Sequence, residues 1–243
     1  MIDLHNHLLP GLDDGAQTLN EALKLAQIAV EDGITHAVCT PHIHPGLYDN
    51  TTTAIRGALE QYQQALSSAG IPLKVAAAAE MHFSLELMPQ AEAKTLPFLG
   101  KWQGKDVFLL EFPHTHIPFG AAKLVDWLIE RDIIPMIAHP ERNQQVIAEP
   151  QNLDSFIDNG CLLQITAGAL TGCFGTAAQH CAEQLMIDDL VTCIATDSHN
   201  SHSRPPVLSE AAAAAEALLG AVYAEQLSKT NPWLITRHQF GNS

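Results

Sequence analysis

Histidine and carboxylate side chains near both ends of this sequence are spaced like metal ligands. His5 and His7 alternate within an apolar, strand-like segment, and Asp197 and His199 directly follow another one. Because alternate residues of a strand point to the same side, the imidazoles of His5 and His7 can reach one cation. With 13 histidines in 243 residues, the chain is rich in a side chain suited to metal and proton chemistry.

Further candidate ligands lie where other strand-like runs end. These are His42, Glu80, Glu111 and His139. In a parallel α/β barrel the carboxyl ends of all strands share one face, which carries the active site. The turn Asp13-Asp14-Gly15 follows His7 closely and is expected to fold back over this face; spacing alone does not separate the two aspartates. We therefore expect a metal centre at one rim of the fold.

The elements that would position these residues alternate along the whole chain. Strands are expected at residues 2–5, 34–40, 73–80, 107–112, 133–139, 161–166 and 191–196. Helices are expected at residues 18–33, 52–70, 84–94, 120–131, 150–160, 175–186 and 207–227. This alternation predicts a single α/β domain over residues 1–243, a distorted seven-stranded (β/α) barrel rather than an open doubly wound sheet. No Gly-x-Gly-x-x-Gly loop follows the first strand, which argues against nucleotide binding.

Composition narrows the class of function. Lys and Arg number 12 against 27 Asp and Glu, a net charge of −15, which argues against nucleic acids and against anionic membrane surfaces as partners. The longest apolar stretch, residues 211–222, contains Glu216 and is too short to span a membrane. The lack of a leader segment and five cysteines without a C-x-x-C pair predict a cytoplasmic protein.

Two common hydrolase mechanisms lack their motifs. A cysteine phosphatase needs an arginine six residues after the nucleophile, and none of the five cysteines has one. A Gly-x-Ser-x-Gly elbow, typical of serine hydrolases, is also missing. The thiols are therefore expected to be dispensable for the chemistry.

Six separated segments carry a family resemblance. They are Asp3-Leu4-His5-Asn6-His7-Leu8-Leu9-Pro10-Gly11-Leu12-Asp13-Asp14-Gly15, Thr40-Pro41-His42, Glu80, Leu110-Glu111-Phe112-Pro113, His139-Pro140-Glu141-Arg142-Asn143, and Asp197-Ser198-His199-Asn200 up to Arg204-Pro205-Pro206. Together they resemble the bacterial tyrosine phosphatases of capsule and exopolysaccharide loci, members of the polymerase-and-histidinol-phosphatase (PHP) superfamily. The resemblance covers residues 1 to about 206 and implies a PHP/amidohydrolase-like barrel.

The resemblance implies three divalent metal ions, Mn²⁺ first, with Fe or Zn as alternatives. The implied ligands are His5, His7, Glu80 and Asp197 for the first ion, Glu80, Glu111 and His139 for the second, and Asp14, His42 and His199 for the third. Asp13 is the alternative to Asp14. Four carboxylates do not neutralise three divalent cations, so the loaded cluster would attract a phosphate dianion although the protein is acidic.

The implied reaction is hydrolysis of a phosphomonoester by a metal-bound hydroxide. Arg142 and Arg204 would hold the phosphate, while Asp197 and His199 serve as ligands first and in proton transfer only secondarily. The implied substrate is a phosphotyrosine protein, first of all a cognate bacterial tyrosine kinase. Two alternatives stay open: a PHP-type phosphatase of histidinol, sugar or nucleotide phosphates, and a non-catalytic regulator that binds a phosphoprotein.

Other histidines and aromatic residues receive simpler predictions, and the oligomeric state receives none. His44, His114 and His116 lie in loops after strands and are candidates to line the mouth of the site, with Tyr48 and Phe119 beside them. Ordinary packing or surface positions are expected for His36, His82, His180, His202 and His238. Trp233 and Phe240, in a tail of about residues 228–243, are expected to pack on the barrel or on a second copy.

Overall fold

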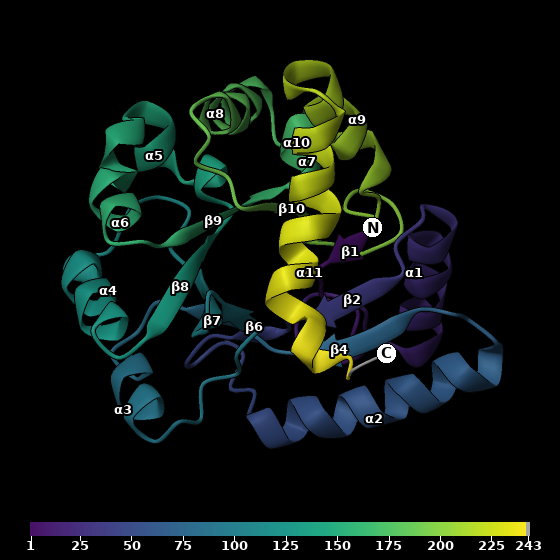
Figure 1. The fold of residues 1–243 in the computed structure, drawn as a ribbon. Coiled ribbons are helices and arrows are strands. Elements are labelled where there is room, and N and C mark those ends of the chain that lie inside the picture. Colours follow the sequence, from purple (N-terminus) through teal and green to yellow (C-terminus); the bar gives the residue numbers. More distant parts are fainter. Residues whose placement is uncertain (242–243) are drawn as a thin grey trace.

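Strands and helices alternate along the chain in this computed structural model, which describes residues 1–241 (Figure 1). Residues 242 and 243 of the predicted domain and tail lie outside the described part. The strands are β1 (Ile2–Asp3), β2 (His36–Cys39), β3 (His42–Ile43), β4 (Lys74–Ala77), β5 (Glu80–His82), β6 (Gly100–Trp102), β7 (Lys105–Glu111), β8 (Ile133–Ala138), β9 (Leu162–Thr166) and β10 (Cys193–Ala195). All seven predicted strand runs contain strand residues, so the predicted α/β alternation is confirmed.

Strand pairing is parallel throughout except for the antiparallel hairpin of β6 and β7. One sheet has the order β1-β2-β4, and the other has the order β10-β9-β8-β7-β5-β3, with β6 paired to β7. The predicted parallel α/β arrangement is thus confirmed. A single closed seven-stranded barrel is not, because the hydrogen-bonded ladders between described residues form two separate sheets. An isolated parallel bridge joins Asn6, after β1, to Ser198, after β10.

One predicted strand run is followed by a short extra strand, and another is divided in two. The run 34–40 ends as β2, and the chain re-enters a sheet as β3 after Pro41, which has no backbone N–H to donate to a ladder. The run 73–80 was expected to end at Glu80, but Glu80 instead opens β5. The reason is a change of partner: β4 pairs with β2, whereas β5 pairs with both β3 and β7.

The helices lie around the outside of the strands (Figure 1). They are α1 (Leu19–Glu31), α2 (Thr52–Ala69), α3 (Leu87–Glu92), α4 (Ala121–Ile129), α5 (Gln144–Ala148), α6 (Asp154–Asp158), α7 (Ala167–Leu170), α8 (Thr176–Ile187), α9 (Ser209–Leu219), α10 (Ala221–Glu225) and α11 (Asn231–Thr236). The predicted helix 207–227 is interrupted at Gly220, whose φ of 91° is outside the helical range. The predicted helix 150–160 opens with a 3₁₀ turn, Pro150–Leu153, before α6.

Local sequence signals explain where the two longest helices begin and end. Thr18 and Glu21 form the predicted capping box of α1, each side chain bonding the other residue's backbone N–H. Gly70 closes α2 in the left-handed conformation, with φ of 66°. The buried Tyr62 of α2 donates its hydroxyl to the carbonyl of Ala22 in α1, which holds these two helices together.

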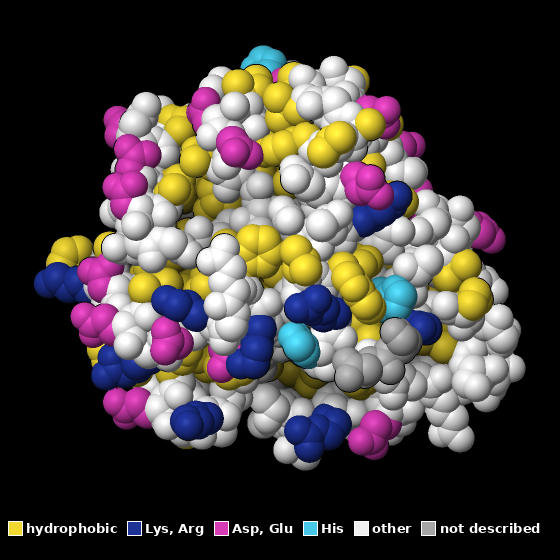
Figure 2. All heavy atoms as spheres, viewed as in Figure 1, with side chains coloured by type: hydrophobic (Ala, Val, Ile, Leu, Met, Phe, Trp, Pro, Cys, Tyr) yellow, Lys and Arg dark blue, Asp and Glu magenta, His cyan; other side chains and the backbone are white. Residues whose placement is uncertain are grey.

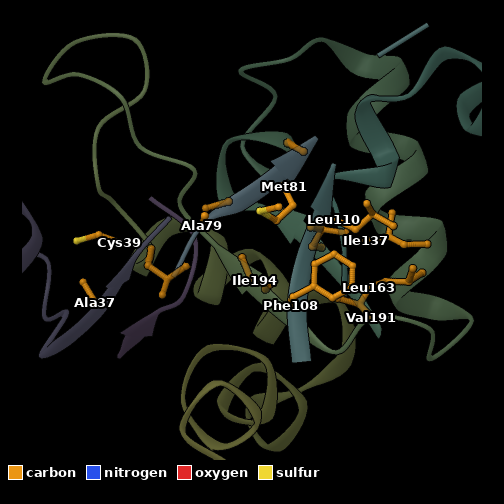
Figure 3. Close-up of a cluster of buried hydrophobic side chains, with 14 of the residues drawn as sticks. Ala37, Cys39, Ala79, Met81, Phe108, Leu110, Ile137, Leu163, Val191 and Ile194 are labelled. Atoms are coloured by element: carbon orange, nitrogen blue, oxygen red, sulfur yellow. The ribbon is translucent and has the colours of Figure 1, made fainter. Parts of the chain in front are cut away.

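Both faces of the strands are buried. Phe108 and Leu110 of β7 pack with Met81, Ile137 and Leu163 of neighbouring strands on the side that the helices cover (Figure 3). Val107 and Leu109, the alternate residues of the same strand, belong to a second cluster with Leu4, Val38, Met136 and Cys193. Burial of both faces is expected where helices cover a parallel sheet, and each fully buried large apolar side chain contributes about 1.5–3 kcal/mol. The carboxyl ends of the strands are therefore held on a rigid frame.

The C-terminal helix α11 closes the opposite end of the strands (Figure 1). Trp233 and Phe240 stack on each other and pack edge-on against His36 at the amino end of β2. Of the two positions predicted for these aromatics, on the barrel or on a second copy, the structure shows the first, and His36 is a packing residue as predicted. Figure 2 shows this face, where basic and acidic side chains are interleaved. Ion pairs join Lys101 of β6 to Asp106 of β7, and Lys105 of β7 to Asp132 just before β8. Within residues 1–241, no helix is both long and apolar enough to cross a membrane.

Candidate metal centre

All nine predicted ligands come together at the carboxyl ends of the strands. Most lie in short strands or directly after them, because the side chains at the carboxyl ends of parallel strands lie at the same rim. These residues are His5, His7, Asp14, His42, Glu80, Glu111, His139, Asp197 and His199. Of them, only Asp14 is well exposed, and its loop folds back over the rim as predicted.

The first group of converging atoms involves His5, His7, Glu80 and Asp197. The Nε2 atoms of His5 and His7 lie 3.3 and 3.4 Å from Glu80 Oε2, and each lies 3.3 Å from Asp197 Oδ1. All four side chains are buried. Two imidazole nitrogens and two carboxylate oxygens around one point form a donor set suited to a divalent transition metal.

The second group differs in detail from the predicted one. His139 Nε2 lies 2.9 Å from Glu80 Oε1 and 3.8 Å from Glu111 Oε1, so all three predicted members are neighbours. However, His42 also converges with the two glutamates: its Nδ1 is 3.0 Å from Glu80 Oε2 and 3.8 Å from Glu111 Oε2. The structure thus places His42 between the second and third groups.

The third group contains Asp14, His42 and His199, and His7 lies beside them. Asp14 Oδ1 is 3.5 Å from the Nε2 atoms of both His42 and His199. Asp13 does not face these two imidazole nitrogens: its Oδ2 lies 2.6 Å from His7 Nδ1 and accepts from the backbone N–H of His42. The geometry therefore favours Asp14 over Asp13 as the loop ligand.

Buried atoms without hydrogen-bond partners test whether these residues fit a metal cluster. His5 Nε2, His7 Nε2, His42 Nδ1, His199 Nε2 and Glu80 Oε2 are all buried, and none of them has a hydrogen-bond partner. Leaving a buried polar atom unpaired costs about 1–3 kcal/mol. Five such atoms directed at the same space are unfavourable unless something binds them, so the residues fit a group of divalent cations.

The other ring nitrogens of two histidines are occupied by buried polar side chains. His7 Nδ1 contacts Asp13, and His5 Nδ1 lies 2.6 Å from Oε1 of the buried Gln164 in β9. Such contacts select the tautomer and orientation that leave Nε2 free for a metal. Gln164 was not among the predicted site residues. The sequence contains a feature that could have identified Gln164: it is the one amide side chain in the apolar run of residues 161–166.

Substitution of Gln164 tests this orienting contact. In Gln164→Leu, His5 Nδ1 loses its partner, so we expect metal affinity to fall by about 10- to 100-fold. Gln164→Glu keeps an acceptor at the same position and is expected to bind metal more tightly than the leucine variant. Titration of apo-protein with Mn²⁺, followed by calorimetry, measures both. Equal affinities in the wild type and the leucine variant would contradict the orienting role.

Three carboxylates of the cluster, those of Glu80, Asp197 and Asp14, are held in their ionised forms. Burial by itself raises the pKa of Glu80 and of Asp197, but His5 and His42 around Glu80 lower its pKa well below the ordinary value. For Asp197 the lowering comes from His5 and His7 together with Arg204 and Arg142. A hydrogen bond with His199 lowers the pKa of Asp14. Ionised oxygens are the form that binds a cation.

Two arginines flank the cluster on one side. Arg142 Nη1 lies 2.5 Å from Asp197 Oδ2, and Arg204 Nη2 donates to the same oxygen. The guanidinium of Arg142 also lies over the ring of Phe174, 4.3 Å from its centre. Asp197 thus presents one oxygen to the imidazoles and the other to two cations. Phe174, which orders Arg142, was not predicted.

Backbone strain accompanies two of the candidate ligands. His139 has φ of 33° and Asp197 has φ of 50°, in the left-handed region that residues other than glycine rarely adopt. Such conformations cost about 1–3 kcal/mol and are concentrated at functional sites. Position 15 requires glycine for a different reason: a Cβ there would lie 2.3 Å from the carbonyl oxygen of His7.

Comparison with known proteins identifies the family of this chain. A family model described as capsular polysaccharide synthesis, CpsB/CapC, matches residues 1–237. The chain belongs to the CpsB/CapC family. It is 34% identical to tyrosine-protein phosphatase YwqE of Bacillus subtilis over 98% of this chain and 92% of the relative. It is 30% identical to a putative tyrosine-protein phosphatase, CapC, of Staphylococcus aureus over 86% of this chain and 81% of the relative.

Solved structures agree with this assignment. A chain from a study of YwqE from Bacillus subtilis and CpsB from Streptococcus pneumoniae, described there as metal-dependent tyrosine phosphatases, matches with a TM-score of 0.91. That match is 33% identical and covers 98% of this chain and 95% of the other. A histidinol phosphate phosphatase from Lactococcus lactis shares the fold at 14% identity, with a TM-score of 0.56 and coverage of 93% and 94%.

At the mouth of this CpsB/CapC-family site, loop side chains pack in pairs. His44 stacks on His82, and Tyr48 stacks on His42. His82 also lies 3.1 Å from Glu111, so its prediction as an ordinary packed or surface histidine missed a contact with the cluster. His114 Nε2 lies 3.3 Å from Arg142 Nη2, which places it at the mouth. His116 is exposed and pairs with Thr115, and Phe119 is fully exposed.

None of the five cysteines of this family member belongs to the groups of converging ligand atoms found among the described residues. Cys39, Cys161, Cys181 and Cys193 are buried and free, and Cys173 is free and exposed. Burial raises the pKa of both Cys161 and Cys181 to about 12. Thiols with raised pKa are poor nucleophiles.

Replacing all five cysteines with alanine is therefore expected to leave kcat/KM within about twofold, provided the variant folds. Steady-state kinetics, with circular dichroism as the folding control, measure this. A large loss of kcat in a folded variant would assign a thiol to the chemistry.

Proposed function

We propose that this protein is a metal-dependent phosphotyrosine-protein phosphatase of capsule or exopolysaccharide biosynthesis. The observation that carries the proposal is the convergence of five buried, unpaired ligand atoms beside two arginines. The named activities of YwqE and the other family members support the same conclusion. The likeness to a histidinol phosphate phosphatase, at 14% identity, extends to the fold and gives no support to a small-molecule substrate.

The proposed cofactor is a group of three divalent ions, with Mn²⁺ preferred and Fe or Zn as alternatives. Three groups of side chains would hold them. These are His5, His7, Glu80 and Asp197; Glu80, Glu111 and His139, with His42 close by; and Asp14, His42 and His199. Bound divalent cations lower the pKa of water toward neutrality and offset the charge of a phosphate group.

The protein's own residues would bind and orient the substrate. Arg142 and Arg204 lie at the edge of the cluster, where their guanidiniums can donate to two phosphate oxygens while Asp197 holds them in place. Phe174 restricts Arg142 from one side. The phosphate would thus be positioned before the reaction, which lowers the entropic part of the barrier.

The leaving group makes few demands on the protein. A phenol such as the tyrosine side chain has a pKa near 10, so its oxygen departs with less need for protonation than an alkyl alcohol. Arg142 and Arg204 would offset the negative charge on the phosphate oxygens as the P–O bond breaks. Asp197 and His199 serve as ligands in this proposal, with proton transfer as a secondary role.

Three further features belong to the proposal. The bridge between Asn6 and Ser198 joins the edges of the two sheets, which supports a distorted seven-stranded barrel extending over one domain. The buried free cysteines suit a reducing, cytoplasmic environment. The proposed partner is the autophosphorylated form of a bacterial tyrosine kinase, since such a protein supplies phosphotyrosine.

The deciding experiment combines metal analysis with a panel of phosphate esters. We expect purified protein to contain bound divalent metal and to release phosphate from a phosphotyrosine peptide with kcat/KM at least about 10-fold above that for histidinol phosphate or nucleotides. Metal removal with a chelator should abolish the activity, and Mn²⁺ should restore it. A preference for histidinol phosphate would favour a small-molecule phosphatase, and tight peptide binding without turnover would favour a regulator.

A further inference from the structure

Three neighbouring loops at the mouth of the site each carry one strongly exposed apolar side chain. Leu47 follows β3, Leu85 follows β5 and Phe119 follows β7, with exposed fractions of 63%, 78% and 102%. These three strands are consecutive in the larger sheet. We call Leu47, Leu85 and Phe119 the apolar rim.

Side-chain packing holds the three loops beside one another. The ring of His44, in the first loop, stacks on that of His82 in β5, with centres 3.8 Å apart and planes within 4°. Phe83 and Phe112, from the second and third loops, pack edge to face. Leu85 and Phe119 each lie two residues before a helix, and the helices that follow, α3 and α4, pack together. The loops therefore form one connected edge.

This edge is continuous with the candidate metal centre. His82 contacts Glu111, and Tyr48, next to Leu47, stacks on the ring of His42. A substrate whose phosphate reaches the cluster would have the residues around its phosphotyrosine close to these loops. Exposed apolar side chains on neighbouring loops beside a polar site are typical of a surface that binds a partner.

Charge in the loops narrows the kind of partner. Residues 44–51, 83–86 and 112–120 contain no Lys or Arg, and their acidic residues are Asp49 and Glu86. The guanidinium of Arg142, beside His114 of the third loop, is engaged by Asp197 and, in the proposed function, by the phosphate. An acidic segment would therefore meet Asp49 and Glu86 with no Lys or Arg in the loops, whereas an apolar segment would bury side chains against the rim.

We propose that the apolar rim binds the residues flanking phosphotyrosine in a polypeptide substrate and selects apolar flanks over acidic ones. This inference rests on the proposed phosphatase function and adds a sequence preference to it. The site recognises the phosphate, and the rim recognises the chain that carries it. A free phosphotyrosine would use only the first.

The test compares peptides with phosphotyrosine between leucine, serine or glutamate residues, and free phosphotyrosine. For the wild type we expect kcat/KM to be about 10-fold higher for the leucine peptide than for the serine peptide, and lowest for the glutamate peptide. In a Leu85→Ser, Phe119→Ser double variant, the leucine advantage should shrink to about twofold through a rise in KM. Turnover of free phosphotyrosine should stay unchanged.

A matched control is available in α10. Val222 is 76% exposed, and its neighbour Tyr223 bonds Met186 near the carboxyl end of α8, on the side of the amino ends of the strands. Val222→Ser removes a comparable exposed apolar side chain and should leave all four substrates unaffected.

The outcomes separate this inference from the proposed function. Failure to hydrolyse free phosphotyrosine would overturn the proposed function, and with it this inference. Normal turnover of free phosphotyrosine with equal kcat/KM for the three peptides would overturn the role of the rim alone. A second result would also overturn the role of the rim: the wild type forms a dimer, the double variant does not, and the two proteins have the same KM for each peptide. The rim would then contact a second copy of the chain and not the substrate.

Discussion

Replacing Glu80 with glutamine is expected to remove most of the bound metal and to lower kcat/KM roughly 1,000-fold or more. The buried carboxylate contacts four imidazoles: Oε2 lies 3.0–3.4 Å from nitrogens of His42, His5 and His7, and Oε1 lies 2.9 Å from His139. The amide has the same shape but no charge. Elemental analysis of the purified variant and phosphate release from a phosphotyrosine peptide measure the two effects.

Glu141→Gln is the matched control, because Glu141 is a second fully buried glutamate. Its Oε1 accepts a hydrogen bond from the backbone N–H of Thr166, and a glutamine can accept the same bond. We expect this variant to keep its metal and to lose no more than a few-fold in kcat/KM. If Glu80→Gln also kept wild-type metal content and turnover, the cluster would not be the active site.

Replacing Arg142 and Arg204 together with alanine is expected to lower kcat/KM about 100- to 1,000-fold while leaving metal content near that of the wild type. Both guanidiniums donate to Asp197 Oδ2, the oxygen that faces away from the imidazoles. In the proposed function they hold phosphate and do not bind the metal. Since they share one partner, the losses in the two single variants should not simply add.

Arg131→Ala serves as the control for general effects of removing a guanidinium. Arg131 packs over the ring of Trp127 in α4, with no contact to the cluster. Its loss should leave kcat/KM within about twofold. Retention of full activity in the double variant, or loss of its metal, would remove Arg142 and Arg204 from phosphate binding.

The candidate ligands were predictable because strand ends are visible in sequence. An apolar run such as residues 133–139 that ends in a histidine reads as a strand whose last side chain reaches the rim, and His139 does lie there. The alternation of His5 and His7 is likewise a local property of an extended chain. The helix boundaries at Thr18 and Gly70 follow from capping chemistry, which also acts within a few residues.

Contacts between distant residues could not be predicted in the same way. Neither the spacing of Asp13 and Asp14 nor their residue type tells which side chain faces His42. The loop that directs the two side chains differently depends on Gly15 packing against His7. The partnership of His5 with Gln164 joins residues 159 positions apart. The division of residues 73–80 into β4 and β5 follows from a change of pairing partner, which is not recorded in the run itself.

Residue types and their local periodicity were thus enough to specify which side chains lie at the carboxyl ends of the strands, because strand direction and alternation are properties of neighbouring residues. Only the folded chain decided which atoms of those side chains face one another, which oxygen of Asp197 meets the arginines, and which backbone positions are strained. Those choices depend on packing between segments that are far apart in sequence, where differences of an ångström determine whether two atoms can share a cation.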